Sequence, residues 1–233
     1  MSPRLLSVNV GRPREVPWAA IGRTSIDRRP VTGAVLVERH GLVGDAVSDT
    51  RHHGGPDKAV YAFAREDLDH WAAELGAEVR DGQFGENLTT VGLDMNEAEI
   101  GEQWRIGTVL LEVRTVRTPC HDFKGWMRVS GFDDRGWVKR FTAEGRPGPY
   151  LRVLQEGTLQ AGDPVEIVHR PGHGVTVSTM FRALTTDSSL LPELLCVDAL
   201  VSEIRVKAER YVAAADRGSS NPTNPRGGSA THA

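Results

Sequence analysis

The feature that most limits the fold is the distribution of apolar residues between positions 5 and 168. They occur in short runs that are rich in β-branched side chains and separated by glycine. This pattern is typical of strands in a barrel or a sandwich. Strands are expected at residues 5–10, 34–38, 58–63, 109–116, 150–155 and 164–169. The chain is therefore predicted to be mainly β.

Two short helices are expected between these strands. In residues 65–75, the apolar Leu68, Trp71 and Leu75 share one face of a helix, and a glycine follows that can cap its end. A second short helix is expected at residues 136–142. A few short helices should thus accompany the sheet.

The pattern changes after residue 170. Between residues 188 and 215 a stripe of period 3.6 predicts helix, and it comprises Leu191, Leu194, Leu195, Val197, Leu200 and Ile204. We expect a β domain at residues 1–170 and a small helical domain at 171–216. Residues 217–233 are mostly Gly, Ser, Asn and Pro, so a disordered tail is expected there.

Charge and composition exclude several classes of protein. A formal charge of -3 provides no basic field to gather nucleic acid, and no run approaches the roughly 20 apolar residues that span a bilayer. Residues 1–10 lack the pattern of a signal peptide, so a cytoplasmic protein is expected. Cys120 and Cys196 are the only cysteines, and they make a poor disulfide framework for this length. Each is expected to be a thiol.

The first segment that could carry chemistry is residues 44–61, where glycine and polar residues precede an apolar strand. Gly54 and Gly55 allow backbone N–H groups to converge on an anion such as phosphate. Three basic side chains lie beside them in the sequence: His52, His53 and Lys58.

Two other interpretations of this segment stay open. One is a tight hairpin loop with solvated histidines. The other is a site for a hard metal, since carboxylate and imidazole suit zinc or iron. Its ligands would be Asp45, Asp49, His52 and His53.

The second segment is residues 84–90, where Glu86 and Asn87 stand between a glycine and an apolar residue. This placement can aim an amide into a pocket. A type I turn with a capping Asn87 explains it equally well.

The third segment is residues 114–123, at the end of the strongest predicted strand. Pro119 ends the strand and presents Cys120 in a loop, with Arg117 and His121 near enough in sequence to favour a thiolate. Such a thiolate can be a nucleophile, a redox thiol or a soft metal ligand. A lone cysteine is more often a small buried hydrophobe, and Cys196 fits that description on its leucine-rich helix face.

Together these segments resemble the MOSC family, which is related to the carboxyl-terminal part of molybdenum cofactor sulfurases. The similarity lies in "GLVGDAVSDTRHHGGPDKAVYAF", "FGENLTT", "IGEQWRIGTVLLEV" and "VRTPC". Within the family the chain is similar to the YiiM-like bacterial subgroup, linked to resistance to hydroxylaminopurine. The similarity covers most of residues 1–170, and "LPELLCVDALVSEIRVKAER" resembles the short three-helix domain that follows the barrel in that subgroup.

The resemblance implies a β-barrel of mixed strands with a pocket for the molybdenum cofactor. It implies that Cys120 is the metal ligand, and the family is also associated with binding of pyridoxal phosphate. Residues expected to bind the cofactor are Arg29, His53, Gly54, Gly55, Lys58, Asn87 and Arg117. Glu86 and His121 are the expected proton donors.

The implied activity is the reduction of N-hydroxylated substrates, such as 6-hydroxylaminopurine, to the amine. The sequence has no flavin, iron–sulfur or dinucleotide motif, so a separate electron-donor reductase is expected. The protein would be a monomer or homodimer without a nucleic acid or membrane partner. Two alternatives remain: a carrier of the cofactor or of a persulfide on Cys120, and a thiol hydrolase with Cys120 as nucleophile and His53 or His121 as base.

Overall fold

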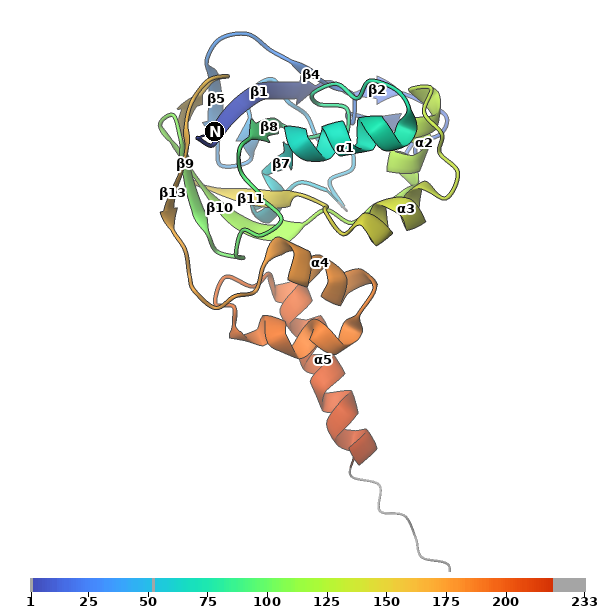
Figure 1. The fold of residues 1–233 in the computed structure, drawn as a ribbon, viewed down its shortest axis with the longest axis vertical. Helices are drawn as coiled ribbons and strands as arrows, with labels where there is room; N and C mark the ends of the chain where they lie inside the picture. Colours follow the sequence, from blue (N-terminus) through green and yellow to red (C-terminus); the bar gives the residue numbers. More distant parts are fainter. Residues whose placement is uncertain (1, 52, 220–233) are drawn as a thin grey trace, which may run out of the picture.

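The main element of the fold is one mixed sheet (Figure 1), seen in a computed structural model that describes residues 2–51 and 53–219. Its eight strands lie in the order β13-β9-β10-β11-β7-β8-β1-β4. These strands are β1 (Arg4–Gly11), β4 (Arg28–Pro30), β7 (Val60–Ala64), β8 (Leu88–Val91), β9 (Gln103–Ile106), β10 (Val109–Val116), β11 (Pro149–Gln155) and β13 (Val165–His169). Neighbours are antiparallel except for the parallel pair β7 and β8. All six expected strands are confirmed, one of them in a smaller sheet.

Two small sheets complete the β structure. The first has the order β12-β5-β6, and the second pairs β2 with β3. Their strands are β2 (Arg14–Glu15), β3 (Arg23–Thr24), β5 (Val35–Glu38), β6 (Gly41–Leu42) and β12 (Gly157–Leu159). The hairpin of β2 and β3 matters below because β3 forms part of a pocket wall.

The expected closed barrel is not confirmed, because β4 and β13 form two separate edges of the main sheet. Backbone hydrogen bonds nevertheless join the start of β1 to the start of β13. Leu5 N–H donates to Asp163 O over 2.8 Å, and Val165 N–H donates to Pro3 O over 3.0 Å. Among the described residues, helices contain at least as many residues as strands do. The prediction of a mainly β chain is therefore wrong, and the fold is mixed α and β.

Helix α1 (Arg65–Leu75) connects the parallel strands β7 and β8, as a crossover between parallel strands requires. Leu68 and Trp71 are buried on its inner face, and Gly76 ends the helix with a φ of 63°. The predicted helix at 65–75 is thus confirmed. The predicted strand at 58–63 begins later, at Val60, because residues Pro56–Lys58 form the 3-10 helix η1.

Two further helices, α2 (His121–Val129) and α3 (Trp137–Glu144), pack on α1 through an aromatic cluster. Phe84 lies at the centre of this cluster, with its ring centroid 5.2 Å from that of Phe123 and 5.6 Å from that of Trp137. Trp71 and Phe141 complete it. Each of these five side chains is nearly or fully buried. The cluster therefore fixes α2, whose first residue follows Cys120.

The chain beyond residue 176 is helical. It forms α4 (Val177–Thr185), the 3-10 helix η2 (Ser188–Cys196) and α5 (Ser202–Ser219), whose end projects from the body (Figure 1). The tail expected from residue 217 is wrong for residues 217–219, which belong to α5, and residues 220–233 lie outside the described part of the chain. No helix among the described residues is long and apolar enough to cross a membrane.

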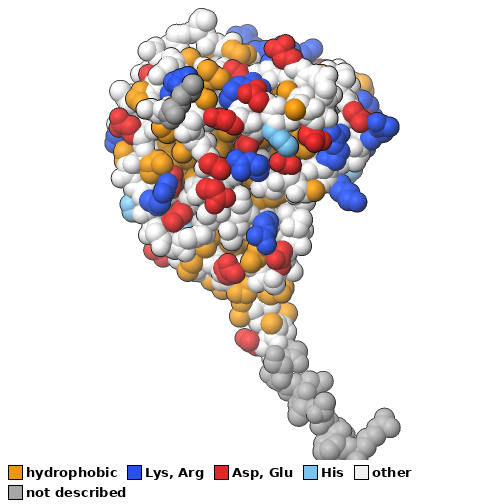
Figure 2. Space-filling model, viewed as in Figure 1, with side chains coloured by type: hydrophobic (Ala, Val, Ile, Leu, Met, Phe, Trp, Pro, Cys, Tyr) orange, Lys and Arg blue, Asp and Glu red, His pale blue; other side chains and the backbone are white. Residues whose placement is uncertain are grey.

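Cys196 is exposed, so its expected burial is wrong. The cause is the 3-10 helix: with about three residues per turn, Leu191, Leu194 and Val197 fall on one buried face. Cys196 lies off that face, where its thiol donates to Glu193 O over 3.1 Å. Elsewhere on the surface, Figure 2 shows acidic and basic side chains interspersed on the visible face.

Candidate functional site

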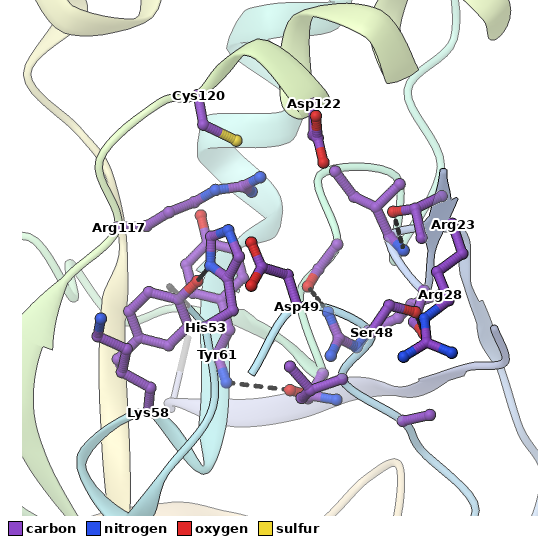
Figure 3. A pocket seen from close by; sticks show the side chains of 18 residues that line it. Arg23, Arg28, Ser48, Asp49, His53, Lys58, Tyr61, Arg117, Cys120 and Asp122 are labelled. Atoms are coloured by element: carbon purple, nitrogen blue, oxygen red, sulfur yellow. Dashed lines mark hydrogen bonds between the residues drawn. The ribbon is translucent and has the colours of Figure 1, made fainter. Parts of the chain in front are cut away.

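A pocket forms where β3, the loop after β6, the start of β7 and the start of α2 meet (Figure 3). The space inside it is about 660 Å³, which includes solvent at its open side. Six residues singled out in the sequence line it: Asp49, His53, Lys58, Asn87, Arg117 and Cys120. Three segments far apart in the sequence are therefore brought together at one pocket.

Cys120 lies at the N-terminus of α2, where it is the N-cap residue. Its Sγ accepts a hydrogen bond from Phe123 N–H over 3.4 Å, and the side chain is half-buried. A helix N-terminus carries a partial positive charge, and the sulfur of Cys120 lies beside it. Figure 3 shows the sulfur directed into the pocket.

Arg117 is the buried cation of the pocket, with 5% of its surface exposed. Its guanidinium carbon lies 3.8 Å from the ring centroid of Phe123 and 5.1 Å from that of Tyr61. One terminal nitrogen donates to Phe84 O. Its buried Nε has no hydrogen-bond partner within the described residues. A buried donor without a partner is costly, so Nε is a site at which an anionic ligand would be stabilised.

The basic residue that β4 supplies to the pocket is Arg28, whereas Arg29 was expected there. Arg28 donates to Asp45 through Nε over 3.0 Å and to Gly85 O through Nη1 over 2.5 Å. Arg29 has a side chain that is 60% exposed and pairs with Asp27 over 2.7 Å. Successive residues of a strand point to opposite sides, so only one of the two arginines can face the pocket.

Glu86 is fully buried and lies behind the pocket lining. Its carboxylate accepts hydrogen bonds from Gly82 N–H over 2.5 Å, Phe84 N–H over 3.0 Å and the Thr89 hydroxyl over 3.1 Å. Burial raises the pKa of Glu86 to about 7, although these hydrogen bonds oppose the rise. The geometry therefore gives Glu86 a positioning role in the turn before β8.

Asn87 lines the pocket and connects three segments of backbone. Its Oδ1 accepts from Tyr61 N–H over 3.1 Å, and its Nδ2 donates to Asp45 Oδ2 over 2.9 Å and to Asn9 O over 3.3 Å. A turn cap would bond only within its own turn, so the capping interpretation is wrong. Through Asp45, Asn87 also holds Arg28 in place.

The loop before β7 contributes His53 and Lys58 to the pocket. His53 Nδ1 lies 3.5 Å from the Tyr150 hydroxyl. Gly54 and Gly55 have φ values of 84° and 80°, which favour glycine, and both lie outside the lining. Their role in this structure is to shape the loop.

Two other expectations, His121 as a proton donor and a hard-metal site in the loop before β7, do not match the structure. His121 is exposed and does not line the pocket. Among the described residues, no three His, Cys, Asp or Glu side chains are grouped as a metal site would need, and Asp45 is paired with Arg28. The hard-metal interpretation also used His52, which lies outside the described residues.

Two tyrosines that had no signal in the sequence, Tyr61 and Tyr150, lie side by side in the pocket wall. They are paired in register between β7 and β11, and their ring centroids are 5.1 Å apart. Burial raises the pKa of both hydroxyls. Nothing local in the sequence links two tyrosines on strands so far apart. Other missed lining residues are Arg23 and Asp122.

Comparison with known proteins identifies the family. The family model of the MOSC domain matches residues 49–166. The chain is 30% identical over 200 residues to the uncharacterized protein YflK of Bacillus subtilis (strain 168), covering 85% of this chain and 87% of that protein. The chain belongs to the MOSC family. Within the family it is YiiM-like: it is 30% identical to Protein YiiM of Escherichia coli (strain K12) over 63% of this chain and 65% of that protein.

Two other relatives of this MOSC protein add to the comparison. A protein of Gibberella moniliformis (strain M3125 / FGSC 7600) named "Reductase" is 30% identical over 81% of this chain, which spans only 34% of that longer protein. The crystal structure of YiiM from Geobacillus stearothermophilus is similar with a TM-score of 0.72 and 25% identity, covering 89% of this chain and 98% of that one. The crystal structure of YiiM from Escherichia coli, at 23% identity and a TM-score of 0.70, supports the same fold.

Proposed function

We propose that this MOSC protein is a molybdenum-cofactor-dependent oxidoreductase that reduces N-hydroxylated compounds, such as 6-hydroxylaminopurine, to amines. The observation that carries the proposal is the placing of the Cys120 sulfur and the unpartnered Nε of buried Arg117 at one pocket. Family membership supports the cofactor. The fungal relative named "Reductase" supports the reaction type.

The donor set of the pocket fits this cofactor. A pterin dithiolene would supply sulfur ligands of its own, so a single soft ligand from the protein, Cys120, is enough. The cofactor is anionic through its phosphate, and the pocket offers Arg117, Arg28 and Lys58 to hold it. Pyridoxal phosphate would use the same phosphate donors but would leave Cys120 without a role.

The reaction needs two electrons and two protons: the N–O bond of the hydroxylamine breaks, and the amine and water form. When bound, the cofactor would supply the two electrons. The chain itself would hold the cofactor at Cys120 and anchor its phosphate at Arg117. A separate electron-donor reductase would have to restore the electrons after each turnover.

The side chain best placed to provide a proton is His53. It lines the pocket and lies next to the Tyr150 hydroxyl, which orients the imidazole. Glu86 and His121 were the expected proton donors, but the first lies behind the pocket and the second lies outside it. We therefore assign the proton-transfer role to His53 and the positioning of the turn before β8 to Glu86.

The test uses full-length protein made in a host that synthesises the cofactor. Elemental and pterin analysis should find molybdenum, and the protein should convert 6-hydroxylaminopurine to the amine with a chemical reductant. Cys120→Ala should lose both the metal and the activity, whereas the matched Cys196→Ser, at an exposed thiol, should keep both.

Each alternative predicts a different outcome of this test. Full loading without any turnover would favour the carrier of cofactor or sulfur. Hydrolytic activity in protein free of molybdenum would favour the thiol hydrolase. A Cys120→Ala protein that retains the metal and the activity of the parent would refute the proposed ligand.

A further inference from the structure

A second hollow adjoins the pocket that Cys120 and Arg117 line, which we call the cofactor pocket. Thr24 of β3 lines both. We call it the tryptophan hollow. Its walls include Trp18, Trp126 and Val129 on the apolar side, and Arg14, Asp27 and Arg29 on the charged side. None of these side chains has a role in the function proposed above.

Two tryptophans form the apolar wall of the tryptophan hollow. Their ring centroids are 6.4 Å apart, with an interplanar angle of 33°. Trp126 is fixed by its indole N–H, which donates to Gln83 O over 2.7 Å. Trp18 packs against α2 at Gly125, where an added Cβ would lie 2.7 Å from the indole. Both rings are therefore held in place. Trp126 is only 8% exposed and Trp18 is half-buried, so Trp18 offers the larger aromatic surface to a planar ring ligand.

The charged wall carries an excess of positive charge. The Asp27 carboxylate accepts hydrogen bonds from Arg14, Arg29 and Arg80, each over 2.7 Å. Of these groups, Arg14, Arg29 and Asp27 line the hollow, and together they carry a net charge of +1. Burial and repulsion from Arg29 lower the pKa of Arg80, which is consistent with crowded positive charge.

The two arginines on the hollow remain accessible to a ligand. The side chains of Arg14 and Arg29 are 63% and 60% exposed, although each already donates to Asp27. A guanidinium group has five N–H donors, so each retains donors for a second acceptor. Phosphate oxygens match this fork geometry and can accept from both arginines.

We propose that the tryptophan hollow binds a nucleoside monophosphate, with its base against Trp18 and Trp126 and its phosphate on Arg14 and Arg29. A free anion would make no use of the indoles, and an uncharged ring would make no use of the arginines. The site needs neither the metal nor Cys120, so it is independent of the proposed reduction. Because Thr24 is shared, a ligand in the hollow lies next to the cofactor pocket.

Isothermal titration calorimetry of the full-length protein with adenosine 5′-monophosphate tests the site. The nucleotide should bind at least tenfold more tightly than either adenosine or inorganic phosphate. The double variant Arg14→Gln and Arg29→Gln should bind the nucleotide at least tenfold more weakly, and its affinity for adenosine should be unchanged. The matched control is Arg135→Gln, at an exposed arginine that also pairs with an aspartate.

A second variant avoids any damage to the fold. Val129 is 51% exposed, so Val129→Asp should fold normally, as thermal unfolding would verify. The added negative charge should lower the affinity for the nucleotide by a similar factor. Equal binding of nucleotide and inorganic phosphate would overturn the proposal. The proposal would also be overturned if the double arginine variant kept full affinity for the nucleotide while Lys58→Gln lost affinity. That result would place the nucleotide in the cofactor pocket instead.

Discussion

Replacing Glu86 by glutamine is expected to change how the free energy of unfolding depends on pH. Burial raises the pKa of Glu86 from 4.5 to about 7 in the folded chain. Because the folded pKa is the higher one, the protonated form stabilises the fold below pH 4.5, and this stabilisation is lost as the pH rises through 7. At about 1.4 kcal/mol per pH unit, the loss amounts to about 3 kcal/mol.

The assay is urea unfolding of the parent and of Glu86→Gln between pH 4.5 and 8. Glutamine does not titrate, so the stability of the variant relative to the parent should rise by about 3 kcal/mol over this range. An exposed glutamate, in Glu166→Gln, serves as the control and should show little change. A constant difference between Glu86→Gln and the parent would refute the reasoning. It would mean that the three hydrogen bonds to the carboxylate offset the effect of its burial on the pKa.

Three further predictions concern stability and thiol chemistry. Gly148→Ala should destabilise the fold by more than about 3 kcal/mol, since its φ is +68° and the added Cβ would clash with the backbone oxygen of Ala62. Gly131→Ala, also at positive φ but with nothing within 4 Å among the described residues, should lose only about 1 kcal/mol by the same unfolding assay. Phe84→Ala should lose about 3–5 kcal/mol, because it empties the centre of the aromatic cluster; a loss below 1 kcal/mol would mean that the cluster is not cooperative. Cys196→Ser should change stability by less than about 0.5 kcal/mol and lower the number of thiols titrated in the native protein from two to one; an unchanged number would contradict the exposure of Cys196.

The sequence predicted the elements whose signals are local. Strand runs and the helix at 65–75 were found because their apolar residues repeat at the period of the element. Helix α2 was missed, although Phe123, Trp126 and Met127 have helical spacing. Gly125 inside the helix weakens its local helical signal. The N-cap position of Cys120 could therefore be learned only from the structure.

Features that depend on distant pairing could not be predicted. The choice between Arg28 and Arg29 depends on the register of a three-residue strand, which nothing in the local sequence sets. The contact of Tyr61 with Tyr150 depends on the pairing of β7 with β11. The sequence likewise named Glu86 without showing on which side of the pocket wall its carboxylate lies.

The position of β1 between β4 and β8 has a consequence for synthesis of the chain. Translation delivers β4 soon after β1, but Leu5 pairs with Thr90 of β8. At roughly 5–20 residues per second, a separation of about 80 residues corresponds to about 4–16 s on the ribosome. During that time one edge of β1 has no partner strand, with the apolar Leu5 and Val8 already made. A nascent chain of this kind is a natural client for a ribosome-bound chaperone.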